Sequence, residues 1–301
     1  FVGRLSRTET SLLIDMSKSL VRPKDILCTL KQKDPTNATT LKAIYNARQK
    51  YKVVEKGGRT QMQFLLGKLK EYNYFEWHRT FSGDSDTVMD IFWLHPLSLD
   101  LLRTFPHVLI LDCTYKTNRY RLPLLEVVGV TSTNMTFSIA FAYLASEKTD
   151  HYEWVLRRLR ALMEDIGAEL PRVMLTDREL ALMSAIDRVF PTSRHLLCRW
   201  HINKNVAANC KKLFETKESW DQFLHHWSLL VMTDTEADYE RHLEEMCSIR
   251  GAFPPAMKYV IESWLTPYRE RFVAVWTNTC MHYGNVTTNR YFSLCFHITL
   301  C

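Results

Sequence analysis

The amino-acid sequence predicts a mixed α/β fold built around one buried sheet. Short apolar runs, typical of strands covered on both faces, occur at 107–112, 172–176 and 195–198. Between the first two runs, residues 152–166 place apolar side chains at the spacing of an amphipathic helix. The 301 residues, of which 46% are hydrophobic and 24% charged, are sufficient for such a core and argue against extensive disorder.

The order of the expected elements specifies the topology. In chain order they are strands 107–112, 124–131 and 136–144, helix 152–166, strand 172–176, helix 179–190, strand 195–198 and helix 201–214. Three strands joined by short turns favour an antiparallel meander, and the helices that follow favour parallel crossovers. This is the ribonuclease-H-like arrangement, so we expect a mixed five-stranded core over 105–215. The first strand should lie between the second and the fourth.

The N-terminal residues 1–56 are expected to form a basic, helix-turn-helix-like segment of three short helices. Residues 1–70 hold 15 Lys and Arg against 5 Asp and Glu, a surplus of +10 within a total of +6. The third helix, with Leu41, Ile44 and Tyr45 directed inward, should expose the candidate DNA-binding residues Lys42, Arg48, Lys50 and Lys52. Such a unit is typical of binding to double-stranded DNA, although a solvated basic face explains the same pattern.

Two further segments flank the core. Residues 57–104 are expected to be a connecting helix and hairpin-like strands, following the linker Gly57-Gly58. Residues 216–285 are helical and aromatic-rich in pattern, which indicates a helical insertion. We interpret 286–301 as an aberrant or truncated end of the core, because its apolar residues lack helical spacing.

Targeting and cysteine patterns narrow the setting of the chain. No apolar run is long enough to span a bilayer, and no secretory signal opens the chain, so no membrane partner is expected. Eight scattered Cys without a Cys-x-x-Cys pair favour a reducing compartment, the nucleus or the cytosol. The first residue is Phe1, not Met, and we therefore expect a fragment or a trimmed translation.

Two aspartates are the best candidates for chemistry. Asp112 and Asp177 follow the first and fourth strands, which this topology makes parallel neighbours, so both should emerge at one sheet edge. Neighbouring carboxylates repel unless a cation lies between them, and oxygen ligands favour Mg²⁺ or Mn²⁺. Two such ions can promote phosphodiester cleavage. Taken singly, Asp112 could instead close a turn, and Asp177 could cap a helix that begins at Arg178.

Three sequence blocks, in order, resemble a known family. Asp112-Cys-Thr-Tyr-Lys-Thr-Asn-Arg-Tyr-Arg-Leu-Pro-Leu-Leu and Thr176-Asp177-Arg-Glu-Leu-Ala-Leu-Met-Ser-Ala-Ile are similar to the two aspartate blocks of Mutator-like element (MULE) transposases. Cys198-Arg-Trp-His201-Ile-Asn-Lys-Asn is similar to their Cys-x-x-His block. The plant far-red-impaired-response proteins share these blocks. The resemblance covers about 105–210 and implies that Asp112 and Asp177 are catalytic, metal-binding acids.

The role of Cys198 and His201 stays open at the sequence level. One Cys and one His supply half of a tetrahedral zinc site, and no second pair stands at a suitable spacing. A structural role, with Cys198 buried in a strand and His201 near a helix start, is the favoured alternative.

The third acid of the family is missing from this chain. The resemblance implies a Glu three residues after the Asn of a Thr-Thr-Asn block, but here Thr287-Thr288-Asn289 is followed by Phe292 at that position. Glu126, Glu179 and Glu262 are weaker substitutes. We therefore expect little or no cleavage activity, and a frame change, splice error or truncation is our hypothesis for the altered end.

Three functions follow from these observations. The first is a MULE transposase or its remnant, acting in the nucleus on double-stranded DNA of element terminal repeats, with Mg²⁺ or Mn²⁺ and with self-association. The second is a domesticated, catalytically dead DNA-binding regulator of transcription of the far-red-impaired-response type. The third, a ribonuclease H relative that cuts RNA–DNA hybrids, is disfavoured by the Cys-x-x-His block and the helical insertion.

Overall fold

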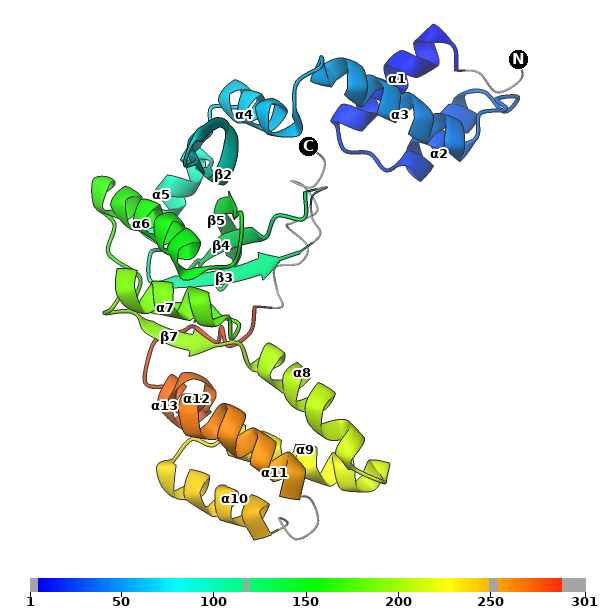
Figure 1. Cartoon of the computed structure of the whole chain (residues 1–301). Coiled ribbons are helices and arrows are strands. Elements are labelled where there is room, and N and C mark those ends of the chain that lie inside the picture. The colour runs from blue at the N-terminus through cyan, green and yellow to red at the C-terminus, as the bar shows by residue number, and fades with distance from the viewer. Residues whose placement is uncertain (1–4, 116–117, 119, 249–253, 289–301) are drawn as a thin grey trace. The chain divides into compact units, whose positions relative to one another are not determined.

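A computed structural model of the chain describes residues 5–115, 118, 120–248 and 254–288. The chain divides into two compact units between Glu71 and Tyr72, and each unit is considered by itself (Figure 1). The larger unit contains the sheet and both candidate aspartates. The smaller unit contains the basic N-terminal helices.

The N-terminal unit is helical, with α1 (Arg7–Lys18), α2 (Pro23–Lys33), α3 (Leu41–Lys56) and α4 (Gln61–Glu71). A reciprocal capping box between Ser6 and Glu9 starts α1, and Gly57 ends α3 in the left-handed conformation. The first three helices bury a small core of Leu13, Ile26, Leu30 and Ile44. Three helices were expected here. Tyr45 was expected to point inward, but it is 55% exposed. The residue of α3 that is buried in this core is its neighbour Ile44.

The larger unit contains one sheet and many helices. Its first part comprises β1 (Phe75–Phe81), β2 (Asp84–Leu94), α5 (Pro96–Thr104), β3 (Val108–Thr114), β4 (Leu124–Val130), β5 (Thr136–Tyr143), α6 (Thr149–Asp165), β6 (Val173–Thr176), α7 (Leu180–Val189), β7 (Arg194–Leu197) and α8 (Arg199–Cys210). The later part comprises the 3-10 turn η1 (Lys211–Leu213), α9 (Lys217–Val231), α10 (Glu236–Ser248), α11 (Pro254–Val260), the π-helical turn η3 (Ile261–Leu265), α12 (Thr266–Phe272) and α13 (Ala274–Thr277).

The sheet is mixed and has the strand order β1-β2-β5-β4-β3-β6-β7. Strands β3, β4 and β5 form an antiparallel meander, and β6 and β7 continue it as parallel neighbours of β3. The expected order of the central strands is therefore confirmed, with β3 between β4 and β6. The five strands expected over 105–215 are present as β3 to β7. The β1–β2 hairpin, expected within 57–104, joins the edge at β5, so the whole sheet has seven strands among the described residues.

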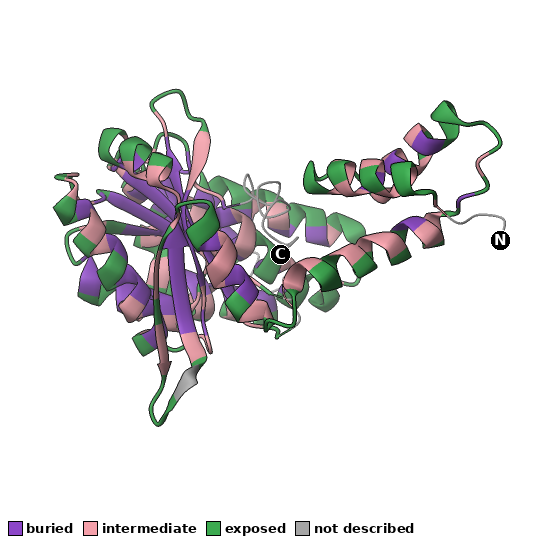
Figure 2. Ribbon diagram, turned by 90° about the horizontal axis from the view of Figure 1, so that it is seen from above, coloured by how far each residue is buried: buried purple, intermediate pink, exposed green. Residues whose placement is uncertain are grey.

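Both faces of the sheet are covered. Helices α6 and α7 pack on one face (Figure 1). Leu109, Leu111 and Met174 belong to the large core on that face. The central strands are largely buried (Figure 2). Alternate residues, among them Ile110 and Leu175, form a second core on the other face. Burial on both faces explains why these strands are almost continuously apolar in sequence.

The residues after β7 form a helical segment with its own aromatic core, as expected for 216–285. Trp220, Phe223, Trp227, Trp264 and Phe272 are all buried in that core. Met183 of α7 and Leu197 of β7 belong to the same core, so the segment packs against the sheet domain. Among the described residues, no helix combines the length and apolar character required to cross a membrane.

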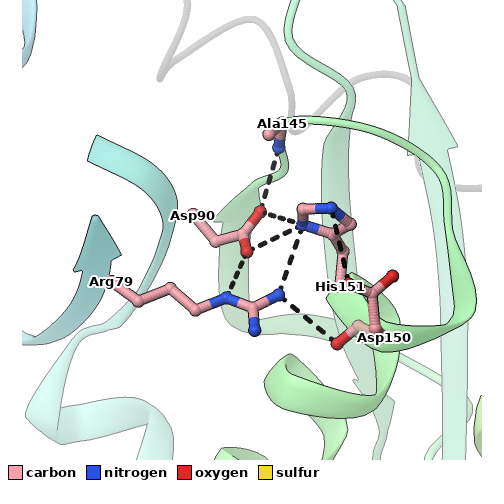
Figure 3. Close-up of polar contacts among 5 residues, drawn as sticks. All are labelled: Arg79, Asp90, Ala145, Asp150 and His151. Carbon is pink, nitrogen blue, oxygen red and sulfur yellow. Dashed lines mark hydrogen bonds and ion pairs between the residues drawn. The ribbon is translucent and has the colours of Figure 1, made fainter. Parts of the chain in front are cut away.

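A buried ionic network attaches the β1–β2 hairpin to the rest of the unit (Figure 3). The fully buried Asp90 carboxylate accepts hydrogen bonds from Arg79 Nε at 2.5 Å and from the Ala145 backbone N–H at 2.9 Å. His151 Nδ1, at the start of α6, lies 2.8 Å from the same carboxylate. Arg79 Nη2 also donates to the Asp150 carbonyl at 3.4 Å. Every Asp90 oxygen therefore has a partner, as a buried carboxylate requires.

Candidate functional site

Asp112 and Asp177 lie level with one another near the ends of two parallel strands. Strands β3 and β6 pair in register up to Ile110 and Leu175. Each aspartate follows two residues later, so the same register carries both to one edge of the sheet. Asp112 was expected to end its strand, but β3 continues to Thr114 because Asp112 still pairs with Glu126 of β4.

The two carboxyls lie in a buried environment with other negative charges nearby. Burial, and then the negative charge of Asp177, raise the pKa of Asp112 to about 7. Burial, followed by the charges of Glu179 and Glu147, raises the pKa of Asp177 to about 6. Both carboxylates are therefore destabilised by desolvation and by nearby negative charge. A cation between them would relieve both effects.

No structural contact of the Asp177 side chain among the described residues explains why a carboxyl is buried at this position. Its Oδ1 atom is buried and has no hydrogen-bond partner among the described residues. The alternative that Asp177 caps a helix is wrong, because α7 begins later and Glu179 is its N-cap, accepting from the Ala181 N–H at 3.3 Å. A buried carboxylate oxygen without a hydrogen-bond partner is unusual in a folded protein.

The suggested substitutes for the third acid occupy different environments. Glu126 is 3% exposed, faces Asp112 across the β3–β4 ladder and accepts from Ser138 Oγ at 2.8 Å. Glu179 is committed to capping α7. Glu262 has a largely exposed side chain in η3, 4.0 Å from Lys258 Nζ. Of these three, Glu126 and Glu179 contribute charge to the aspartate pair.

Glu147 is an acid near the pair that the sequence patterns did not single out. It lies between β5 and α6, and its Oε1 accepts from Tyr115 Oη at 2.5 Å and from Tyr152 Oη at 3.1 Å. After burial and the charge of Glu179, its charge also contributes to the raised pKa of Asp177. The signal available in the sequence was its place just before a helix, at the same edge as the strand ends.

The two aspartates fit part of a site for a divalent cation. Within 5–115, 118, 120–248 and 254–288, no three His, Cys, Asp or Glu side chains lie close enough to hold a metal together. Asp112 and Asp177 nevertheless fit as two oxygen ligands, since both are electrostatically strained and one oxygen lacks a partner among the described residues. The pair could thus offer two oxygen ligands, part of a complete site, to a hard cation.

Cys198 and His201 meet at the start of α8, around Thr288. The buried Cys198 is the residue before α8, not part of a strand as expected, because β7 ends at Leu197. Its Sγ accepts from the Thr288 backbone N–H at 3.2 Å, and Thr288 Oγ1 lies 3.6 Å from that sulfur and 3.4 Å from His201 Nδ1. The Arg199 N–H also donates to the Val286 carbonyl at 2.9 Å. The pair therefore contacts the segment that returns after the helical insertion.

The remaining predicted residues lie elsewhere. Lys42, Lys50 and Lys52 are exposed on α3 of the N-terminal unit, and Arg48 is partly buried there. Phe292, the residue in place of the third acid, lies outside the described residues.

Comparison with known proteins identifies the central part of the chain. Residues 108–205 match the MULE transposase domain family. FAR1-RELATED SEQUENCE 5 of Arabidopsis thaliana is 27% identical over 184 residues, which cover 60% of this chain and 23% of that protein. FAR-RED IMPAIRED RESPONSE 1 of the same plant is 22% identical over 242 residues, covering 80% of this chain and 28% of that protein.

Two other similarities are less informative, one because it covers little of the relative and one because the structures superpose poorly. A PKS-NRPS hybrid synthetase, cheA, of Chaetomium globosum is 28% identical over 222 residues, which cover 70% of this chain but 5% of the synthetase. The chain thus spans less than a third of these curated relatives. The solved Mos1 strand transfer complex aligns with 84% of this chain at 10% identity and a TM-score of 0.22, a superposition too loose to support an argument.

The matched range begins at β3, contains Asp112, Asp177, Cys198 and His201, and ends within α8. It coincides with the segment whose three sequence blocks resemble the family. Residues 108–205 therefore match the MULE transposase domain, and the chain is similar to the FAR1-related proteins.

Proposed function

We propose that this chain is the ribonuclease-H-like core of a MULE transposase that binds DNA but has lost cleavage activity. The observation that carries the ancestral chemistry is the Asp112–Asp177 pair, level on two parallel strands, with Asp177 Oδ1 buried and unpartnered among the described residues. Asp112 and Asp177 would hold Mg²⁺ or Mn²⁺, as a two-metal site by ancestry. When bound, such ions activate a water and stabilise the leaving oxygen of a phosphodiester.

The chain's own acidic residues would supply the ligands and the negative charge that favour cation binding. The two carboxylates would supply charge and oxygen ligands at the sheet edge, and Glu126 and Glu147 would add negative potential that favours cation binding. Phe292 cannot replace a ligating carboxylate, because a phenyl ring has no oxygen. Incomplete ligation explains why we expect binding of a metal without efficient cleavage.

The basic helix α3 is our candidate DNA-binding element. It exposes Lys42, Lys50 and Lys52, and Tyr45 joins them on the outer face. Lysines and arginines that contact phosphates supply most of the affinity of such surfaces for duplex DNA. A helix-turn-helix role for α1–α3, self-association on paired element ends and residence in the nucleus belong to this proposal.

For Cys198 and His201 we propose a structural role in place of zinc binding. Thr288 occupies the space between them, and both contacts to it are compatible with a neutral imidazole, since burial, and then Lys204, lower the pKa of His201. The Cys198 sulfur and a neutral imidazole can hold a hydroxyl without any ion.

The proposal is tested with purified chain and duplex DNA that carries element ends. Mn²⁺ affinity is measured by isothermal titration calorimetry for the wild type, Asp112→Ala, Asp177→Ala and the exposed control Asp165→Asn. Loss of Mn²⁺ binding in the first two variants alone would support the site, and DNA binding without cleavage would support the inactive core. Cleavage that persists in Asp112→Ala would remove the pair from consideration.

The alternative function is a domesticated, catalytically dead regulator of transcription. Similarity to the FAR1-related proteins and the Phe at position 292 favour it. Terminal inverted repeats that flank the gene would favour a transposon copy. Their absence, together with sequence-specific DNA binding by the chain, would favour the regulator.

A further inference from the structure

A buried chain of hydrogen bonds runs from the helical segment to the backbone of Asp177. Arg271 on α12 places Nη1 2.7 Å from His195 Nδ1 on β7. The His195 Nε2 atom lies 2.8 Å from Thr176 Oγ1 at the end of β6. Thr176 Oγ1 in turn donates to the Asp177 carbonyl at 2.6 Å. His195 is 5% exposed and Thr176 is 0% exposed, so the central bond of this chain is shielded from water.

The direction of every bond in this chain is determined by chemistry. A guanidinium has donors only, so His195 Nδ1 must accept the hydrogen bond from Arg271. The imidazole proton is then on Nε2, from which it donates to Thr176. The Thr176 hydroxyl therefore has its own proton free for the Asp177 carbonyl. In agreement, burial, and then the Arg271 charge, lower the pKa of His195 to about 3, which keeps the ring neutral.

The residue on the other side of Asp177 is also attached to the helical segment. Arg178 Nη1 donates to the Ser263 carbonyl at 2.9 Å. Its guanidinium carbon lies 4.1 Å from the centre of the Trp264 ring. Both residues belong to the π-helical turn η3, a local irregularity that is frequent at functional sites. Thr176 and Arg178 thus link both neighbours of Asp177 to the insertion.

We propose that Arg271, His195 and Thr176 are positioning residues through which the helical segment fixes the backbone of Asp177. This backbone support matters because Asp177 Oδ1 has no partner among the described residues to hold the carboxylate. Outer residues of this kind orient metal ligands and influence metal affinity. The hydrogen-bond chain does not depend on the proposed function, but the effect of that chain on metal affinity rests on the proposed function.

Two matched pairs of variants test the effect on affinity in the full chain. Thr176→Val removes the hydroxyl and keeps the shape, and Thr176→Ser restores the hydroxyl. Arg271→Ala removes the first donor, and Arg269→Ala is its control on the same helix, because Arg269 faces Tyr239 and Trp276 inside the helical segment. We expect Mn²⁺ affinity to fall about 10- to 100-fold in Thr176→Val and Arg271→Ala, and to stay within about 3-fold of wild type in the other two.

A second measurement does not depend on any metal. Nitrogen-15 NMR of histidine-labelled chain should show His195 as the neutral Nε2–H tautomer, and this signature should change in Arg271→Ala but not in Arg269→Ala. A proton on Nδ1 in the wild type, or equal behaviour of Thr176→Val and Thr176→Ser, would overturn the inference. If the wild type does not bind Mn²⁺, or if Asp112→Ala does not abolish that binding, the proposed function fails. The NMR result still decides whether the hydrogen-bond chain exists.

Discussion

Asp177 lies beside Asp112 across the β3–β6 pair, and burial together with the negative charge of Asp177 raises the pKa of Asp112 above the usual range of a carboxyl. The two aspartates are more than sixty positions apart in sequence and are brought together by strands β3 and β6. Their coupling is therefore a property of the fold. It also makes the pair sensitive to pH and to cations in ways that can be measured.

The contribution of Asp112 and Asp177 to stability should fall as pH rises from about 4 to about 7. The folded-state pKa values of Asp112, about 7, and Asp177, about 6, lie above the ordinary value of 3.8, so these two carboxyls bind more protons in the folded chain than in the unfolded chain in this window. Asp112→Asn should therefore be more stable than wild type at pH 7.5 by about 2 kcal/mol, with a smaller difference at pH 4.5. Urea unfolding at both pH values provides the measurement.

Divalent cations should reverse the difference in stability between wild type and Asp112→Asn. Millimolar Mg²⁺ or Mn²⁺ at pH 7.5 should stabilise the wild type and leave Asp112→Asn unchanged, because only the wild type keeps both ligands. Asp165→Asn, an exposed acid on α6, serves as the control. Equal stabilisation of wild type and Asp112→Asn would contradict the proposed binding of a cation by the pair.

Cys198→Ala should release the backbone N–H of Thr288. A buried donor without a partner costs about 1–3 kcal/mol, so exchange of this amide with solvent should accelerate about 10-fold or more. Cys198→Ser keeps an acceptor at that position and should behave nearly as wild type, although serine is a poor zinc ligand. Cys210→Ala, which removes a buried thiol at the end of α8, is the control. Stoichiometric zinc in the purified chain, removed equally by the Ala and Ser substitutions, would instead indicate a metal site.

Asp90→Asn should destabilise the larger unit strongly. It leaves Arg79 and His151 without their buried carboxylate, and breaking a buried pair by removing one partner costs about 3 kcal/mol or more. The comparison is Glu153→Gln, which removes a partner of Arg157 and Arg188 at the surface and should cost less than about 1 kcal/mol. Similar unfolding midpoints for the two variants would show that the network contributes little.

Charge removal on α3 should weaken DNA binding and its salt dependence. Replacing Lys42, Arg48, Lys50 and Lys52 with Ala should reduce the slope of log affinity against log salt by about 0.9 for each DNA phosphate that the helix no longer neutralises. A control that replaces Lys18, Lys24, Lys31 and Lys33 changes the net charge equally on α1 and α2. Fluorescence anisotropy with labelled duplex DNA measures both. Equal weakening in the two variants would point to a diffuse charge effect without a binding face on α3.

The sequence predicted the central sheet well because its signals are local. Apolar runs, helix spacing and Gly167, which terminates α6 with a φ of +66°, were sufficient to place β3 to β7 and their order. The same patterns placed Asp112 and Asp177 together. The β1–β2 hairpin was expected, but its pairing with β5 was not, because no short-range pattern specifies which edge a hairpin joins.

The positioning residues around the site could not be found in this way. His195 lies in an apolar strand, where a histidine usually has a structural partner, and its partner Arg271 is 76 positions away. Asp90 offered a better signal, since an acid within the apolar stretch before Leu94 requires buried partners. The identity of those partners, Arg79 and His151, depends on the three-dimensional pairing of β2 with β5 and the packing of α6.

The hairpin that extends the sheet also has a consequence for solubility. Strand β1 is the outermost strand, and its pairing with β2 is irregular between Arg79 and Phe81. An irregular edge presents few aligned N–H and C=O groups, and the charged Glu76 and Arg79 disfavour docking of an apolar strand. This margin of the molecule is therefore protected against growth into intermolecular β-structure, a hazard that the more apolar β5 would present if the hairpin were removed.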